Sequence, residues 1–210
     1  AQNYNTSGLD YSYGPEKKEN RLLTLYANYN KLVESIKSSF DVTAGYDYQY
    51  WKSTTPLYSE MNTLGEIQKT SKAKDERHVL LSYYGRLNYS FDSRYMLTTT
   101  IRRDATSRFA KNVRWGTFPS VALGWRVTEE SFLKDNKVLS NLKLRASYGV
   151  TGQQDGIGNY NYLPIYTQSQ NGAEASMGNG YIHTYRPSSY VPDLKWETTT
   201  SWNVGFDFGF

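Results

Sequence analysis

Apolar and polar residues alternate along this chain, most regularly over residues 36–50 and 194–210. From Ile36 to Tyr50 the even-numbered positions are apolar or aromatic apart from one serine, whereas the odd-numbered positions are polar or glycine. The even-numbered row of the second stretch is Leu194, Trp196, Thr198, Thr200, Trp202, Val204, Phe206, Phe208 and Phe210. Because side chains alternate across a β-strand, both stretches predict strands with one apolar face and one polar face.

Five further segments show the same alternation, so the sequence predicts seven strands. Their apolar rows are Leu23, Leu25, Ala27 and Tyr29; Val79, Leu81, Tyr83, Gly85, Leu87, Tyr89 and Phe91; Tyr95, Leu97, Thr99 and Ile101; Val121, Leu123, Trp125 and Val127; and Leu142, Leu144, Ala146, Tyr148 and Val150. The strand predicted at 194–210 is much longer than the roughly 5–6 residues usual in globular domains. A tilted strand needs about 9–11 residues to cross a bilayer, which this strand exceeds.

The connections between the predicted strands alternate between short and long. The short ones are 31–35, 92–93 and 128–141, and the long ones are 52–77, 103–117 and 152–193. The connection 128–141 is predicted to form a helical turn that Thr128 caps and whose first turn contains Glu130 or Ser131. Outer-membrane barrels have short periplasmic turns and long extracellular loops. Soluble sandwiches also contain alternating strands, but seven strands with alternating connections favour a membrane barrel. We therefore predict an all-β fold, an antiparallel transmembrane β-barrel segment whose odd-numbered strands run toward the periplasm.

The aromatic content supports this prediction. The chain holds 20 Tyr, 5 Trp and 8 Phe, and Tyr and Trp suit the interfacial girdles of a membrane barrel. Trp51, Trp115 and Trp196 lie near predicted strand ends, where we expect girdle anchoring. The mean hydropathy of −0.70 fits a soluble protein or a barrel equally well. No run approaches the ~20 apolar residues of a membrane helix, and residues 1–14 do not resemble a signal peptide.

Several classes of function are disfavoured by the residues present. There are no cysteines, which excludes disulfide scaffolds, cysteine-based zinc sites and cysteine nucleophiles. The net charge of +4 comes from interspersed charges, so nucleic-acid binding is not expected. His78 and His183 are far apart in sequence, and we predict no enzyme activity, metal site or cofactor. The glycine-rich run 151–160 is predicted to form turns, because no helix follows that would hold a phosphate.

Four stretches contain more specific motifs. They are GRLNYSFDSRYMLTTTIRRDATSRFA (85–110), with an Arg-Asp-x-Ser/Thr-Ser-Arg-Phe loop; WGTFPSVALGWRVTEESFLKD (115–135); LKLRASYGVTGQQDGIGNYNYLPIY (142–166); and LKWETTTSWNVGFDFGF (194–210). Together these stretches resemble the SusC/RagA family of TonB-dependent outer-membrane transporters. Ala105 departs from the pattern, since the family more often has glycine there. Residues 1–76 match in alternation more than in motif.

The resemblance implies a larger protein. Such transporters are single-chain barrels of about 22 strands with a plugged lumen, so residues 1–210 would be part of the β-barrel domain, with the plug domain and the remaining strands absent from this chain. An odd number of strands in an open sheet also predicts further strands, because open edges would leave backbone groups unpaired in hydrocarbon. The implied location is the outer membrane of a Gram-negative, Bacteroidetes-like bacterium, in contact with outer-membrane lipid.

The implied function is active import of oligosaccharides, or of peptides. The family works with a SusD-like surface lipoprotein that closes over the extracellular mouth and takes its energy from the TonB system acting on the plug. Two alternatives remain open from the residues alone. One is a soluble β-rich polysaccharide-binding module, and the other is a small self-contained barrel that acts as an adhesin.

The long segment 152–193 contains the candidate ligand-binding residues. Aromatic rings stack on the apolar faces of sugars, and amide or carboxylate groups bind hydroxyls; the candidates are Tyr160, Tyr162, Tyr166, Asp155 and Asn159. The alternative is that these rings pack the loop or contact the lipoprotein. A second group, Arg102, Arg103, Arg108, Lys111 and Arg114, is expected either to meet lipopolysaccharide phosphates or an acidic ligand, or to pair with Asp104 and other loop carboxylates.

Overall fold

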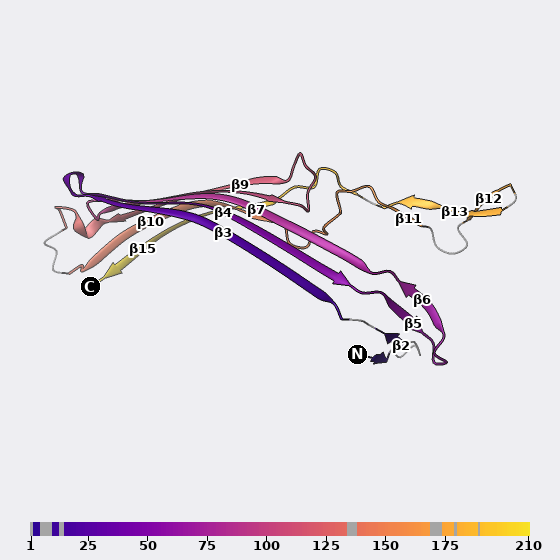
Figure 1. Ribbon diagram of the computed structural model, residues 1–210. Coiled ribbons are helices and arrows are strands. Elements are labelled where there is room, and N and C mark those ends of the chain that lie inside the picture. Colours follow the sequence, from indigo (N-terminus) through magenta and orange to yellow (C-terminus); the bar gives the residue numbers. More distant parts are fainter. Residues whose placement is uncertain are drawn as a thin grey trace.

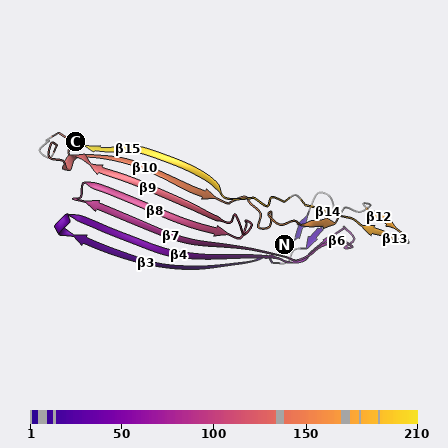
Figure 2. The same ribbon diagram turned by 90° about the horizontal axis from the view of Figure 1, so that it is seen from above.

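The computed structural model describes residues 2–4, 10–12, 15–133, 138–168, 174–178, 180–188 and 190–210. Seven of its strands form one sheet: β3 (Lys17–Val33), β4 (Ser38–Thr55), β7 (Lys74–Phe91), β8 (Tyr95–Thr106), β9 (Trp115–Arg126), β10 (Asn141–Gln153) and β15 (Glu197–Gly209). They pair antiparallel in the order β15-β10-β9-β8-β7-β4-β3, so each strand lies beside its sequence neighbour in the sheet (Figure 2). The predicted all-β fold and seven strands are confirmed.

The register of the sheet places the predicted apolar rows on one face. Leu25 lies opposite Tyr46, and Tyr46 lies opposite Tyr83, with the two tyrosine rings 5.2 Å apart. Exposed apolar side chains of this face include Leu23, Leu25, Leu123, Trp202, Val204, Phe206 and Phe208. An apolar surface of this extent is a surface that lipid or another apolar layer covers. No helix among the described residues is long and apolar enough to cross a membrane.

The other face carries most of the polar side chains, although Leu22, Tyr26 and Leu32 of β3 also lie on it, and it is cross-linked between strands. Arg102 on β8 pairs with Asp104 at 2.9 Å and with Asp47 on β4 at 3.5 Å, and it donates a hydrogen bond of 2.8 Å to the Ser82 hydroxyl on β7. The Tyr84 ring lies directly over the Gly45 backbone, where any larger residue would overlap it. Three strands are therefore fixed to one another through their polar side chains as well as through their backbones.

Three connections lie at one end of the sheet, together with the C-terminus, and we call this the turn end (Figure 1). They are residues 34–37, 92–94 and 127–140, and they include the 3-10 helices η1 (Glu34–Ile36) and η2 (Val127–Glu129). Lys37, Asp92 and Ser93 have positive φ angles of 49–55°, which lets the chain reverse tightly between strands.

One carboxylate connects several groups at the turn end. Glu130 accepts hydrogen bonds from the Tyr95 hydroxyl at 2.6 Å and the Trp125 indole N–H at 3.0 Å, and it forms an ion pair with Arg94 at 3.0 Å. The hydrogen bond from Tyr95, followed by that from Trp125, holds the pKa of Glu130 below its ordinary value of 4.5. Glu130 thus joins the connection after β9 to the turn before β8.

The long connections lie at the opposite end, which we call the loop end (Figures 1 and 2). These connections, together with the segment before β3, form small sheets separate from the main sheet. One has the order β1-β2-β5-β6, formed by β1 (Gln2–Tyr4), β2 (Asp10–Ser12), β5 (Tyr58–Met61) and β6 (Ile67–Ser71). The others pair β11 (Tyr166–Gln168) with β14 (Tyr185–Pro187), and β12 (Glu174–Met177) with β13 (Gly180–His183).

Some boundaries differ from those predicted. The alternation of connection lengths is wrong at one place, because residues 107–114 between β8 and β9 are fewer than residues 127–140 between β9 and β10. The reason is that Arg103–Ala105 pair with Trp115–Thr117 and extend both strands into the predicted connection 103–117.

Three further boundary predictions are corrected. Ile36 lies in η1, and β4 begins only at Ser38. The turn at η2 starts before Thr128, at an N-cap position occupied by Arg126 that makes no side-chain capping bond. The last strand begins at Glu197 and leaves Trp196 outside it.

Candidate ligand-binding site at the loop end

A small aromatic cluster closes the loop end. The Phe109 side chain is fully buried (0% exposed), and it meets the Trp196 ring edge-to-face at 5.6 Å. Phe118 also meets the Trp196 ring edge-to-face, at 5.3 Å, and the Phe118 ring occupies the space where Gly152 has no side chain. The Trp196 indole N–H donates a 2.9 Å hydrogen bond to the Arg114 carbonyl. The connection between β8 and β9, the connection that leads into β15, and strands β9 and β10 are thereby fixed together.

The segment that carries the Arg-Asp-x-Ser/Thr-Ser-Arg-Phe motif folds back onto the start of β7. The Ser107 hydroxyl accepts a hydrogen bond from the Val79 N–H at 2.9 Å, and the Ser107 N–H donates to the Val79 carbonyl at 2.9 Å. The hydroxyl of the buried Thr106 lies 3.2 Å from Nε2 of His78. These contacts give the motif residues a structural role and aim the next side chain, Arg108, at the following loop.

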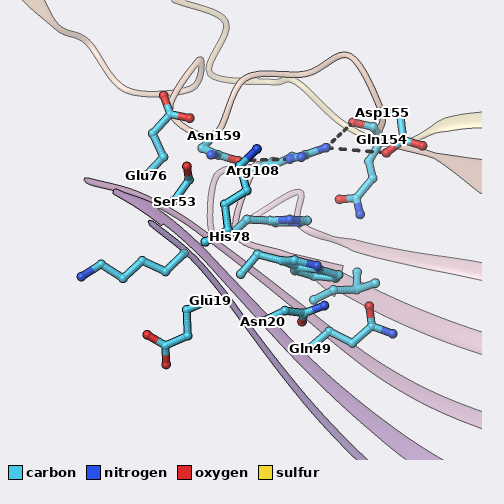
Figure 3. A pocket seen from close by; sticks show the side chains of 14 residues that line it. Glu19, Asn20, Gln49, Ser53, Glu76, His78, Arg108, Gln154, Asp155 and Asn159 are labelled. Carbon is cyan, nitrogen blue, oxygen red and sulfur yellow. Dashed lines mark hydrogen bonds and ion pairs between the residues drawn. The ribbon is translucent and has the colours of Figure 1, made fainter. Parts of the chain in front are cut away.

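Arg108 joins two loops (Figure 3). Its Nε donates to Oδ1 of Asn159 at 3.2 Å, its Nη1 donates to the Gln154 carbonyl at 3.0 Å, and it lies 3.8 Å from the Asp155 carboxylate. The guanidinium presents several donors in a fixed plane, which lets one side chain hold three acceptors of the same loop. Arg108 therefore positions residues 154–159 over the polar face of the sheet.

A cavity of about 680 Å³ lies beneath this loop. Its strand-borne wall includes Asn20, Gln49, Trp51 and His78, and its loop-borne wall includes Arg108, Asp155 and Asn159. The register places Asn20, Trp51 and His78 side by side on β3, β4 and β7. A cavity of this size with aromatic and polar walls fits one or a few monomer units of an extended ligand.

The structure places only some of the predicted ligand-binding residues at the cavity. Asp155 and Asn159 line the cavity. Tyr160 lies close by, where its hydroxyl accepts a 3.2 Å hydrogen bond from the Arg77 N–H. Tyr162 is half-buried and Tyr166 is 66% exposed on β11, and neither lines the cavity. A role for the five residues in ligand binding stays a prediction.

The girdle prediction is wrong for two of the three tryptophans. Trp196 packs in the aromatic cluster, and Trp51 lies on the polar face beside His78, because its odd number puts it on the face opposite Tyr46, Tyr48 and Tyr50. The alternation along residues 36–51 therefore already indicates that Trp51 lies on the polar face. Trp115 does lie on the apolar face, 42% exposed.

The predicted cluster of cations does not gather at one place. Arg102 pairs with Asp104, in agreement with the alternative considered for this group. Arg108 faces the cavity, whereas Arg103 lies over the Trp115 ring at 5.2 Å on the apolar face. The second histidine, His183, pairs across β12 and β13 with Glu174 at 3.1 Å. No group of three or more metal-ligating side chains occurs within the described ranges.

Comparison with known proteins identifies the class of protein. A family model described as TonB dependent receptor-like, beta-barrel, matches residues 1–210. The chain therefore belongs to the TonB-dependent receptor family of β-barrels, and the resemblance to SusC/RagA proteins is confirmed. Members of this family are transporters, in agreement with the prediction that the protein is not an enzyme.

Two individual members of the family are similar to this chain in sequence. The TonB-dependent receptor SusC of Bacteroides thetaiotaomicron is 44% identical over 198 residues, which are 87% of this chain and 19% of SusC. The TonB-dependent receptor P39 of Formosa agariphila is 35% identical over 202 residues, 87% of this chain and 18% of P39. The chain thus spans about a fifth of the length of these relatives.

The fold is also found in a solved structure of the RagAB peptide transporter. The match has a TM-score of 0.77 and covers 96% of this chain and 22% of the RagAB chain. At 23% sequence identity it shows a common fold. A second RagAB structure, in the open-open state, matches with a TM-score of 0.73.

Proposed function

We propose that this chain is part of a TonB-dependent transporter that actively imports oligosaccharides, or peptides, across the outer membrane of a Gram-negative, Bacteroidetes-like bacterium. The family match along residues 1–210 carries the proposal. The sheet agrees with it, because one face exposes a continuous apolar surface while the other is polar and cross-linked by ion pairs. A membrane barrel needs this division between lipid and lumen.

The division of the sheet into two ends supports one orientation in the membrane. Barrels of this kind place short turns in the periplasm and long loops outside, so the turn end faces the periplasm and the cavity opens at the extracellular mouth. Residues 1–210 belong to the β-barrel domain, and the plug domain and the other strands belong to the rest of the protein. Energy from the TonB system acts through those other parts.

The long connection between β10 and β15 is the part of this chain best suited to contact a SusD-like lipoprotein. Its small strands expose apolar side chains beyond the main sheet, including Tyr181 (77% exposed), Ile182, Met177 and Tyr185. Exposed aromatic and methionine side chains are enriched at protein interfaces. The RagAB relative is described as a peptide transporter, so peptides stay an alternative to oligosaccharides for this protein.

The decisive test is uptake by the native bacterium that makes the full-length protein. We expect deletion of the gene to abolish uptake of one class of oligosaccharide or peptide, and loss of TonB to abolish the same uptake. Uptake that continues without TonB would contradict active import. A full-length protein that stays soluble without detergent would instead support the polysaccharide-binding module.

The predicted ligand residues have their own test. In the full-length transporter, Tyr160→Ala and Tyr162→Ala should weaken binding of the imported ligand, as should Asp155→Ala and Asn159→Ala at the cavity wall. Tyr166→Ala extends the series to an exposed residue that does not line the cavity. Unchanged affinity in both the Tyr160 and Tyr162 variants would show that these rings only pack the loop.

A further inference from the structure

The wall of the cavity contains a stacked pair of rings. The Trp51 and His78 rings lie 4.7 Å apart with only 11° between their planes. His78 is 8% exposed and is held from behind by Thr106 at 3.2 Å. The indole of Trp51 is half-buried and lines the cavity. A large flat ring surface is thus fixed in place at a site whose other lining residues, apart from Leu80, are polar or charged.

The charged groups around this surface already have partners. Lys52 pairs with Asp75 at 3.1 Å, and Arg108 is held by the loop that carries Asp155. The remaining lining charges are paired in the same way, Lys18 with Glu16, Glu19 with Arg21, and Glu76 with Lys74. A charged ligand would have to compete with these pairs, so the wall offers little net charge to attract one.

Two uncharged polar side chains of the cavity wall, unlike the charged ones, are unpaired within the described part of the chain. Asn20 lies directly opposite Trp51 in the sheet, and Gln49 lies two residues before Trp51 on the same face. Their amide side chains have no hydrogen-bond partner among the described residues, and both line the same cavity as Trp51. Each amide offers both donors and an acceptor, which matches the mixed hydrogen-bonding of sugar hydroxyls.

We propose that Trp51, supported by His78, is a stacking platform for one ring of a neutral oligosaccharide, with Asn20 and Gln49 binding the hydroxyls at the edge of that ring. Aromatic surfaces next to a few fixed polar groups are the usual composition of a specific small-ligand pocket. The platform rests on the proposed import function and narrows its substrate class from oligosaccharide or peptide to neutral saccharide.

The test uses the full-length transporter purified in detergent, with maltohexaose, cellohexaose, xylohexaose and mannohexaose as neutral probes and a mixture of short peptides as the competing class. Binding is measured by calorimetry for the wild type, Trp51→Ala, Trp51→Phe and Trp115→Ala. Trp115 is the matched control, because it is a tryptophan at the same end of the sheet on the apolar face. Tm is recorded for each variant so that misfolding is recognised.

We expect at least one hexaose to bind, Trp51→Ala to weaken it by about tenfold or more, Trp51→Phe to weaken it less, and Trp115→Ala to leave it unchanged. Asn20→Ala and Gln49→Ala should each reduce affinity by a smaller factor. Equal affinity of the wild type and Trp51→Ala, or binding of peptides with no hexaose bound, overturns the platform.

Uptake assays with and without TonB separate this result from the import proposal. Uptake of peptides alone, dependent on TonB, would leave the import function standing while the platform fails. Hexaose binding that depends on Trp51, combined with uptake that ignores TonB, would support the platform and overturn active import.

Discussion

The turn end and the loop end of the sheet are closed by different kinds of contact. At the turn end, Glu130 gathers the Tyr95 hydroxyl, the Trp125 indole and the Arg94 guanidinium within 3.0 Å, so a few hydrogen bonds fix the connections. At the loop end, the buried Phe109 packs with other rings, and polar groups surround a cavity. One end is arranged for tight reversal of the chain, and the other encloses space.

The two ends also differ in how far apart their partners lie in sequence. At the turn end, the bonds of Glu130 to Trp125, Tyr95 and Arg94 join residues 5, 35 and 36 apart. At the loop end, Arg108 and Asn159 are 51 apart, and Trp196 and Arg114 are 82 apart. Long-range contacts require several loops to be in place together, because each closes a long segment of chain. The loop end should therefore respond to single substitutions more cooperatively than the turn end.

The largest effect is expected for Phe109→Ala at the loop end. Removing a fully buried phenyl ring leaves a cavity and typically costs about 3–5 kcal/mol. The free energy of unfolding of the full-length protein in detergent measures the loss, and hydrogen exchange should rise in both residues 107–114 and residues 154–165. Phe132→Ala, at a 69% exposed phenylalanine of the turn end, is the matched control and should change little. Equal losses in both variants would refute the contrast between the ends.

A smaller effect is expected for Gly152→Ala. A Cβ at this position would overlap the Phe118 ring, which must move to accommodate it, and overpacking of this kind costs about 1–3 kcal/mol. Gly149→Ala on the same strand is the control, because its nearest neighbour would be Ser120 at an ordinary 3.4 Å. Denaturant unfolding of the two variants compares them directly. A Gly152→Ala protein as stable as Gly149→Ala would show that Phe118 moves aside without cost.

The smallest effect is expected at the turn end, for Glu130→Gln. The pKa of Glu130 is held below 4.5, so its charge stabilises the folded state above that value, and this contribution is lost as the pH falls through the lowered pKa. Tm should be a few degrees lower in Glu130→Gln than in the wild type at pH 7, and the two should converge in acid. Glu129→Gln, at an exposed neighbouring residue, controls for the change in net charge. A Tm difference that stays constant down to pH 3 would contradict the role given to the carboxylate.

Much of the fold could be predicted because the strand period leaves a direct record in the sequence. Seven strands and their apolar face follow from alternation alone, and the structure confirms them. The alternation did not predict every strand end. The predicted connection 103–117 includes Arg103–Ala105, yet these residues pair with β9.

The candidate site was predicted only in part. Asp155 and Asn159 were selected for their chemistry within a glycine-rich loop, and the structure brings both to the cavity. Trp51 was missed because its position near a strand end suggested a girdle. Its partners His78 and Asn20 come from two other strands, so only the register of those strands reveals the stacked pair.

The sequence by itself determined the strand faces, the all-β class and the family, because alternation and local motifs depend on neighbouring residues. Only the tertiary structure decided that Trp196 leaves the apolar row to pack with Phe109, and that Arg108 holds one loop over a cavity. The physical reason is that these contacts join residues far apart in the chain. Their geometry depends on strand register and loop closure, which no local pattern encodes.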